Sequence, residues 1–182
     1  WQGEPVAVVV AASRAQAEDA SELINIEWHP LPAVADMESA IAPSAPIIHS
    51  ELNDNICFSR TSETDGIDDV FENSTHIIEE TFTVERQTPV TLEPRSILAD
   101  YNPGKEFLTV YMSSQVPHMM QYLYAKHLGL AETNIRVKVP DMGGGFGLKI
   151  HIYGDETATT ALSIMLKRPV KFVADRIESF IS

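Results

Sequence analysis

The N-terminal part of the chain joins an apolar run to an amphipathic segment. Residues 5–12 read PVAVVVAA, and a continuous β-branched run of this kind is typical of a strand buried on both faces. Ser13 follows as a candidate N-cap, and apolar residues over 14–24 recur at helical spacing. Residues 25–32, NIEWHPLP, are expected to follow the helix as a short strand that ends at Pro30 and Pro32. The pattern predicts a β-α-β unit over residues 5–32.

The next part of the chain has no sustained hydrophobic period. Residues 33–66 are rich in Pro, Asn and Asp, which predicts a long irregular connection. A short helix is expected over 66–74 with Asp65 as its cap. Residues 76–86 then carry apolar side chains on one face and change register near Glu80, which predicts a long strand with a bulge or bend.

From residue 97 onward, strand and helix patterns alternate. Two strands over 97–114 are joined at Asn102-Pro103-Gly104, a strong hairpin turn. The elements expected after it are a helix over 114–129 with Ser114 as cap and Gly129 as its end, a strand over 134–141, a helix over 154–168 and a strand over 169–176. The predicted core faces are Val116, Met119, Met120, Leu123, Tyr124 and Leu128 on the first helix, and Ala158, Ala161, Leu162, Met165 and Leu166 on the second. The fold class is therefore α+β.

Composition narrows the classes of function. The 182 residues carry a net charge of −13, which argues against nucleic acid and anionic membrane surfaces as partners, because both need a basic face. Cys57 is the only cysteine, so a disulfide, a thiolate zinc site and an iron–sulfur cluster within this chain are excluded. No run of 18 apolar residues is present to span a membrane. The chain begins at Trp1, and we expect residues upstream of it to be missing.

The most unusual stretch is DMGGGFGLK, residues 141–149, which directly follows a predicted strand. Successive backbone N–H groups in such a loop can form a concave anion site. A Walker loop is excluded because Ile150 stands where Ser or Thr is required after Lys149. A dinucleotide fingerprint is disfavoured because LKIHIYGD delays the next helix. A tight turn between strand and helix remains the structural alternative.

With its flanks, VPDMGGGFGLK resembles the loop of the xanthine oxidase and aldehyde oxidase family that lies against the molybdenum of a molybdopterin cofactor. Other matches occur in the same order and cover nearly the whole chain. They are GEPVAVVVAASRAQAEDASELINIEWHPLPAV (3–34), RQTPVTLEPRSILADY (86–101), SSQVPHMMQYLYAKHLGL and RPVKFVADRIES. The chain looks closest to large subunits of the aerobic carbon monoxide dehydrogenase type.

The resemblance implies a domain layout. Residues 1–35 would be the C-terminal part of an α/β-hammerhead domain and residues 36–74 an interdomain connection. Residues 75–182 would form the N-terminal part of a molybdopterin-binding domain. The chain is therefore expected to be a fragment of a large subunit.

The resemblance also implies a set of cofactor contacts. The Gln87 side-chain amide would hydrogen-bond an oxo ligand of the metal, and Gln115 would contact the pterin. The loop backbone would touch both, so that a side chain at Gly145 would obstruct the oxo ligand. The predicted cofactor-binding residues are Gln87, Gln115, Gly144, Gly145, Phe146 and Gly147. No catalytic residue and no protein ligand to the metal are expected in this chain, because the family's general-base glutamate comes later.

Several side chains have plainer interpretations. Gln87 could be an exposed strand residue and Gln115 a helix cap. Glu93 and Arg95 in LEPR are interpreted as a structural ion pair. Two further interpretations are that His118, Met119 and Met120 serve packing rather than metal binding, and that His151 could face a substrate.

The implied function is that of a molybdenum hydroxylase, an oxidoreductase. The full protein would oxidise an aldehyde, an N-heterocycle or carbon monoxide with water as oxygen donor. Its partners would be iron–sulfur and flavin subunits or domains and a small-molecule substrate, with a homodimer possible and the cytoplasm as location. The chain alone is expected to be inactive and without molybdopterin. The alternative is a stand-alone folded piece with a structural role or none.

Overall fold

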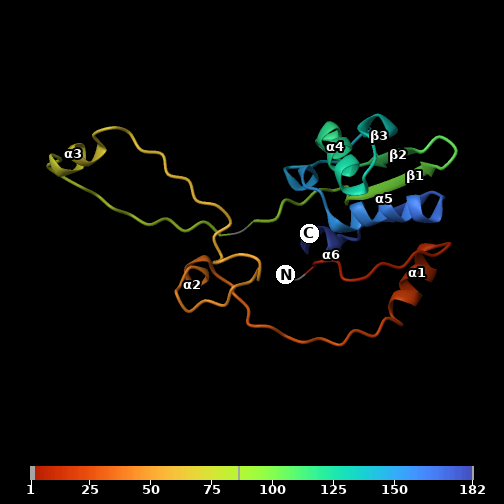
Figure 1. The fold of residues 1–182 in the computed structure, drawn as a ribbon, viewed down its shortest axis with the longest axis horizontal. Coiled ribbons are helices and arrows are strands. Elements are labelled where there is room, and N and C mark those ends of the chain that lie inside the picture. The colour runs from red at the N-terminus through yellow and green to blue at the C-terminus, as the bar shows by residue number, and fades with distance from the viewer. Residues whose placement is uncertain (1–2, 86, 182) are drawn as a thin grey trace. The chain divides into compact units, whose positions relative to one another are not determined.

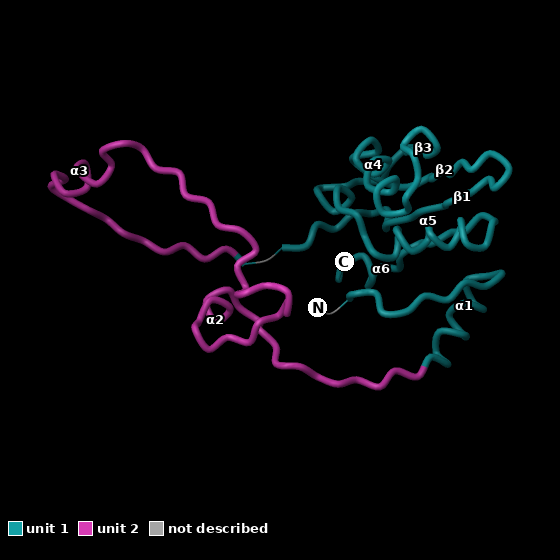
Figure 2. The backbone as a smooth tube through the Cα atoms, in the orientation of Figure 1, with its two compact units in different colours: residues 1–24, 85–182 teal, residues 25–84 magenta. Residues whose placement is uncertain are grey.

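The computed structural model describes residues 3–85 and 87–181. The chain divides into two units, which Figure 2 colours separately. One unit combines residues 1–24 with residues 85–182, and the other consists of residues 25–84. The first unit contains all of the described strands and the glycine loop, so it holds the candidate site.

A four-stranded sheet forms the centre of the first unit (Figure 1). Its strands are β1 (Ser96–Asn102), β2 (Phe107–Met112), β3 (Ile135–Lys138) and β4 (Val170–Val173), in the order β3-β2-β1-β4. Strand β1 runs antiparallel to both β2 and β4, whereas β2 and β3 are parallel. The sheet is therefore mixed, which agrees with the predicted α+β class.

The predicted hairpin between β1 and β2 is confirmed. Asn102 pairs with Phe107 at the turn, and the Lys105 N–H donates to the Asn102 backbone carbonyl at 3.3 Å and to its Oδ1 at 3.1 Å. Alternate residues of both strands are buried, because successive side chains point to opposite faces of a sheet. One face therefore carries the core, which includes Ile97, Ala99, Leu108, Val110 and Met112.

Helix α4 (Pro117–Leu128) confirms the first predicted helix. Its buried residues are Met120, Tyr124 and Ala125, and Met119 is more exposed than predicted. Gly129 ends the helix with φ of 67°, a left-handed conformation that glycine adopts without steric cost. Ser114 lies two residues before the helix cap, Val116, and its Oγ accepts the Val116 N–H at 3.2 Å.

The second predicted helix, α5 (Gly154–Leu166), forms with a different face toward the sheet. The predicted core residues Met165 and Leu166 are exposed. The buried positions are polar: Glu156, Thr159, Thr160 and Ser163. Hydroxyl groups can lie there because they find backbone partners, as when Ser163 Oγ donates to the Ala99 carbonyl at 3.1 Å and accepts the Tyr101 N–H. The prediction that the apolar face of α5 is its buried face is therefore wrong.

The predicted N-terminal β-α-β unit forms only in part. Helix α1 (Arg14–Ser21) is present, and Ser13 Oγ accepts the Gln16 N–H at 3.3 Å as its cap. Residues 5–12 and 25–32 contain no strand, so these two predictions are wrong. An extended segment becomes a strand only when a second segment completes its hydrogen bonds, and the described chain supplies none there.

Irregular backbone dominates the second unit, as predicted for residues 33–66. It contains α2 (Met37–Ala40), capped by Asp36, and α3 (Ile67–Glu72), which begins after Gly66 rather than after Asp65. The predicted strand over 76–86 is absent from its described part, residues 76–85.

Asn55 organises the compact part of this unit. Its Oδ1 accepts the Ile48 N–H at 2.9 Å, and its Nδ2 donates to the carbonyls of Ala40 and Pro46, each at 3.0 Å. One side chain therefore closes a loop that has almost no apolar core of its own.

Three short helical segments complete the first unit: η1 (Glu132–Asn134), η2 (Leu148–Ile150) and α6 (Arg176–Ile181). Segment η2 follows the glycine loop directly, and α6 follows β4. None of the described helices is both long and apolar enough to cross a membrane.

Substitution of two methionines tests which faces of α4 and α5 are buried. Met120 is fully buried and Met165 is 74% exposed, although the sequence placed both on core faces. Met120→Ala should lower the free energy of unfolding by about 2–5 kcal/mol, because it leaves a cavity. Met165→Ala should change it by no more than about 0.5 kcal/mol. Urea unfolding of both variants makes the measurement, and equal losses would contradict the described face of α5.

Candidate functional site

The glycine loop lies between β3 and η2 and contains left-handed backbone at three positions. Gly144 and Gly147 have φ of 99° and 92°, values that glycine tolerates. Phe146 also has positive φ, at 51°. A left-handed conformation costs a non-glycine residue about 1–2 kcal/mol. Contacts around the loop must therefore hold Phe146 in place.

The close approaches that require glycine come from two side chains of the same chain. A Cβ added at Gly143 would lie 2.6 Å from the Cβ of Glu93. A Cβ added at Gly145 would lie 2.5 Å from Cδ of Gln115. The missing side chain of Gly145 leaves room for Gln115. The expected contact of Gly145 with a metal's oxo ligand stays a prediction.

Glu93 binds the loop from one side. Its Oε2 accepts hydrogen bonds from Ser113 Oγ at 2.7 Å, the Gly143 N–H at 2.8 Å and Lys149 Nζ at 2.7 Å. Burial by itself would raise the pKa of Glu93, but the hydrogen bonds from Lys149, Gly143 and Ser113 outweigh it and hold the pKa below its ordinary value. Lys149 is only 2% exposed, so Glu93 compensates a buried charge.

Gln115 binds the loop from a second segment, before α4. Its Oε1 accepts the Gly147 N–H at 3.1 Å and the Lys149 N–H at 3.3 Å. The Gln115 N–H in turn donates to the Lys149 carbonyl at 3.0 Å. Gln115 therefore supports the loop backbone and does not cap a helix. Its predicted contact with a pterin stays a prediction.

The loop presents three consecutive N–H groups that have no acceptor in the described part of the chain. They belong to Gly144, Gly145 and Phe146. The N–H groups of Gly143 and Gly147 on either side are both satisfied. Backbone donors are paired in the great majority of protein structures, so a run of three is a candidate anion or ligand contact.

An open pocket of about 340 Å³ lies beside the loop. It brings together three of the predicted cofactor-binding residues, Gln87, Phe146 and Gly147. Its other lining residues are Thr88, Pro89, Leu148, His151 and Tyr153. Gln87 is exposed and lies in no strand, so its amide is available to a ligand. The two loop positions Gly144 and Gly145 and the support residue Gln115 are not among the lining residues.

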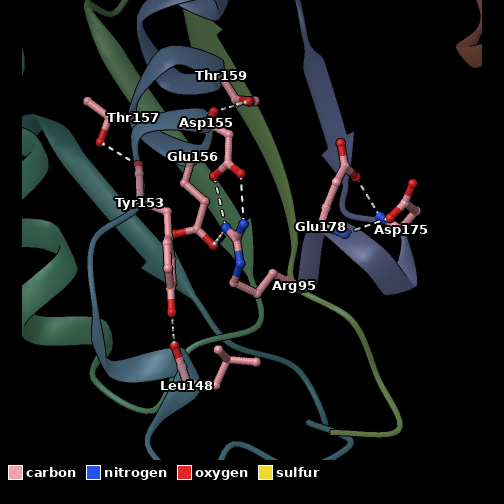
Figure 3. A network of polar contacts seen from close by, with 9 residues as sticks. All are labelled: Arg95, Leu148, Tyr153, Asp155, Glu156, Thr157, Thr159, Asp175 and Glu178. Carbon is pink, nitrogen blue, oxygen red and sulfur yellow. Dashed lines mark hydrogen bonds and ion pairs between the residues drawn. The ribbon is translucent and has the colours of Figure 1, made fainter. Parts of the chain in front are cut away.

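Arg95 lies at the centre of a network of polar contacts that includes Tyr153, Asp155 and Glu156 (Figure 3). Its guanidinium donates to both carboxylate oxygens of Asp155, at 2.8 and 2.7 Å, and to Glu156 Oε1 at 3.3 Å. The same group lies 3.8 Å from the ring centroid of Tyr153, whose OH donates to the Leu148 carbonyl at 2.6 Å. The start of α5 is thereby tied to the end of the glycine loop.

The predicted ion pair between Glu93 and Arg95 is wrong. Glu93 pairs with Lys149, and Arg95 pairs with Asp155 and Glu156. The two residues are separated by one position, Pro94, and each makes ion pairs with residues far along the chain instead. LEPR therefore anchors two separate buried clusters, one at the loop and one at α5.

Glu156 is the most strongly perturbed carboxyl group. Burial, opposed by Arg95 and supported by the charge of Asp155, raises the pKa of Glu156 to about 7. Its Oε2 has no hydrogen-bond partner among the described residues. A buried carboxylate oxygen without a partner is costly, which favours the protonated form.

Sequence reasoning missed Lys149, Ser113 and Tyr153 as parts of the site. Lys149 could have been suspected, because it ends the glycine motif, but its burial depends on Glu93. Among the described residues, no group of three His, Cys, Asp or Glu side chains could hold a metal ion. His118 is exposed and Met120 is buried in the core, which supports packing at Met120 alone.

The chain is similar to known proteins over its whole length. The family of molybdopterin cofactor-binding domains matches residues 48–182. The nicotine 6-hydroxylase large subunit of Paenarthrobacter nicotinovorans is 36% identical over all of this chain and 22% of its own length. The carbon monoxide dehydrogenase large chain of Hydrogenophaga pseudoflava is 33% identical over 98% of this chain and 24% of its own length.

A solved structure gives the same result in three dimensions. Quinoline 2-oxidoreductase from Pseudomonas putida 86 matches with a TM-score of 0.83 and 35% identity. The match covers 93% of this chain and 21% of that one. The chain thus spans between a fifth and a quarter of the length of these relatives.

The raised pKa of Glu156 predicts a pH dependence of stability. A folded-state pKa above the ordinary value of 4.5 means that the folded chain binds this proton more tightly. The contribution of protonated Glu156 to the free energy of unfolding is therefore full below about pH 4.5 and is lost as the pH rises through about 7. Glu156→Gln should remove a fall of about 3 kcal/mol in the free energy of unfolding between these limits.

Urea unfolding at several pH values between 4.5 and 8.5 measures this difference. Glu132→Gln is the control, because Glu132 is exposed and undergoes the same change. If the Glu156→Gln chain keeps the pH slope of the original, Glu156 does not titrate in this range.

Proposed function

Because the chain belongs to the family of molybdopterin cofactor-binding domains, we propose that its glycine loop and pocket form one wall of the cofactor site in a molybdenum hydroxylase large subunit. The activity is proposed for the whole protein, since the relatives are more than four times as long as this chain. In this proposal, the chain supplies residues that position the cofactor and N–H groups that donate hydrogen bonds to it.

One observation carries the proposal: three consecutive N–H groups have no acceptor among the described residues, and their loop lines a pocket together with Gln87. The N–H groups of Gly144, Gly145 and Phe146 fit the oxygen and sulfur acceptors of a molybdopterin, which is anionic. The Gln87 amide is a suitable fourth donor, because it adds no charge. The exposed ring of Phe146 would form one side of the cavity and exclude water from it.

The domain layout follows the same proposal. We assign residues 1–35 to the end of an α/β-hammerhead domain, 36–74 to an interdomain connection and 75–182 to the start of the molybdopterin-binding domain. The mixed sheet and the glycine loop lie in the third segment. Arg95 and Asp155 would then stabilise the cofactor-binding domain, rather than the connection between domains.

The proposed reaction is hydroxylation of a small molecule with water as oxygen donor. The bound cofactor would supply the redox chemistry, and iron–sulfur and flavin subunits or domains would take up the electrons. The substrate would be an aldehyde, an N-heterocycle or carbon monoxide. The relatives' names include nicotine, quinoline and carbon monoxide, so they support the class of reaction without selecting a substrate.

Gln87 offers a direct test in the large subunit that carries this segment. Gln87→Glu keeps the shape of the side chain but replaces its N–H donors with a negative charge. Loss of one preorganised donor costs about 10²–10³ in rate, and we expect at least this loss in activity per bound molybdenum. Gln87 is exposed, so the melting temperature should not change.

Molybdenum per polypeptide, pterin fluorescence and activity are measured together. Gln16→Glu, an identical change on the exposed surface of α1, is the control. Unaltered molybdenum content and unaltered activity per molybdenum in Gln87→Glu would refute this contact and favour the alternative, a folded piece without a cofactor.

Self-association is a further expectation for the isolated chain. Several large apolar side chains are strongly exposed, among them Trp28, Phe58 and Phe82, and strands β3 and β4 are the two edges of the sheet. Exposed apolar surface and open sheet edges favour association. We propose a homodimer, and light scattering over increasing concentration should show the mass doubling. A constant monomer mass would contradict it.

A further inference from the structure

We propose that Glu93 and Gln115 are positioning residues that hold the glycine loop from two sides and leave the N–H groups of Gly144, Gly145 and Phe146 without an acceptor among the described residues. The role of these donors toward a cofactor rests on the proposed function. The positioning itself concerns only this chain and can be measured without any cofactor.

Glu93 holds both ends of the loop. Its side chain accepts the Gly143 N–H at 2.8 Å, and its own N–H donates to the Gly143 carbonyl at 3.3 Å. Gly143 is thus bound through both of its backbone groups. The same carboxylate oxygen binds Nζ of Lys149 at 2.7 Å, six residues further along. Ser113, at the end of β2, donates to that oxygen as well and connects the carboxylate to the sheet.

Gln115 holds the second half of the loop. Its Oε1 accepts two N–H groups, those of Gly147 and Lys149, and its backbone N–H donates to the Lys149 carbonyl. Its side chain also fills the space that a Cβ at Gly145 would occupy. A carbonyl is suited to this role, because it accepts two hydrogen bonds without adding a charge.

The two residues together decide which donors remain available. Glu93 takes the N–H of Gly143, and Gln115 takes those of Gly147 and Lys149. The N–H groups between them have no described acceptor. Phe146 has left-handed backbone, which persists only where the surroundings enforce it. Loss of the hydrogen bonds with either Glu93 or Gln115 should therefore let the Phe146 backbone leave its left-handed conformation and change the direction of its N–H group.

Charge compensation distinguishes this arrangement from ordinary packing. Lys149 is almost fully buried, and its ammonium group is paired with Glu93. Glu93→Gln keeps an oxygen for the Gly143 N–H but leaves the buried ammonium without its counter-charge, which is strongly unfavourable. Removing both charges, in Glu93→Gln with Lys149→Met, should restore much of the loop geometry. A purely steric role would not show this rescue.

Amide hydrogen exchange of the 182-residue chain, followed by nuclear magnetic resonance, tests the proposal. In the unaltered chain the Gly143, Gly147 and Lys149 amides should exchange slowly, and the Gly144 and Phe146 amides quickly. Glu93→Gln should speed exchange at Gly143 by about tenfold or more, since a charge-assisted hydrogen bond is lost. The double variant should recover most of this protection.

Gln115→Leu, which removes the carbonyl, should speed exchange at Gly147 and Lys149 by a similar factor and leave Gly143 less affected. Ser163→Ala is the matched control. Ser163 is fully buried and hydrogen-bonded in α5, so its loss destabilises the unit away from the loop. It should raise exchange throughout the unit without selecting loop amides.

The pH profile provides a second measurement if a single variant does not fold. The depressed pKa of Glu93 means that the Gly143 amide shift should change only below the ordinary glutamate range, and this change should be absent from the double variant. The proposal would be overturned if all variants exchanged their loop amides at the same rates. It would also be overturned if the pH dependence of the Gly143 amide chemical shift were the same with and without Glu93.

These results separate the two proposals. Selective loss of loop protection with normal cofactor content in Gln87→Glu would retain the positioning role and reject the cofactor contact. If exchange rose without selecting loop amides and the Gln87→Glu enzyme were defective, the cofactor contact would be retained and the positioning role rejected.

Discussion

The carboxylate of Glu93 is the point at which three distant segments of the chain meet. One oxygen binds Ser113 at the end of β2, Gly143 at the start of the glycine loop and Lys149 at its end. Without this group a buried ammonium would lack its counter-charge, and the loop would lose a contact at each end. The backbone geometry of Gly144, Gly145 and Phe146 depends on it, and so does the direction of the donors that they present.

Arg95, on the other side of Pro94 from Glu93, is a second buried cation besides Lys149, and it also connects distant segments. Arg95 joins the first turn of α5 through Asp155 and Glu156, and stacks on Tyr153, which in turn holds the Leu148 carbonyl. Four consecutive residues, LEPR, thus connect the loop and the helix to the start of β1. Buried ion pairs are weak contributors to net stability, but breaking one leaves an uncompensated charge. Here these pairs connect the loop, the helix and the sheet.

The glycines of the loop have two different roles. Gly143 and Gly145 are small because side chains of the chain itself, Glu93 and Gln115, occupy the adjacent space. Gly144 and Gly147 supply left-handed backbone. The loop is therefore shaped mainly by its own protein, and a ligand would meet a surface that is already formed. Preorganised donors of this kind are effective because they need no rearrangement when the ligand binds. This is consistent with membership of a molybdopterin-binding family.

Local sequence by itself determined the hairpin at Asn102-Pro103-Gly104, the existence of α4 and α5, and the end of α4 at Gly129, because turn chemistry and helical spacing act over a few residues. The glycine motif, together with the ordered matches along the rest of the chain, was enough to identify the family and to bring Gln87, Phe146 and Gly147 under consideration. Only the tertiary structure decided which face of α5 is buried, that residues 5–12 form no strand, and that Glu93 pairs with Lys149 rather than with Arg95. Strand pairing, the partners of buried charges and the space beside a glycine all depend on residues 20 to 60 positions apart. No local pattern encodes such contacts, because the fold alone brings these residues together.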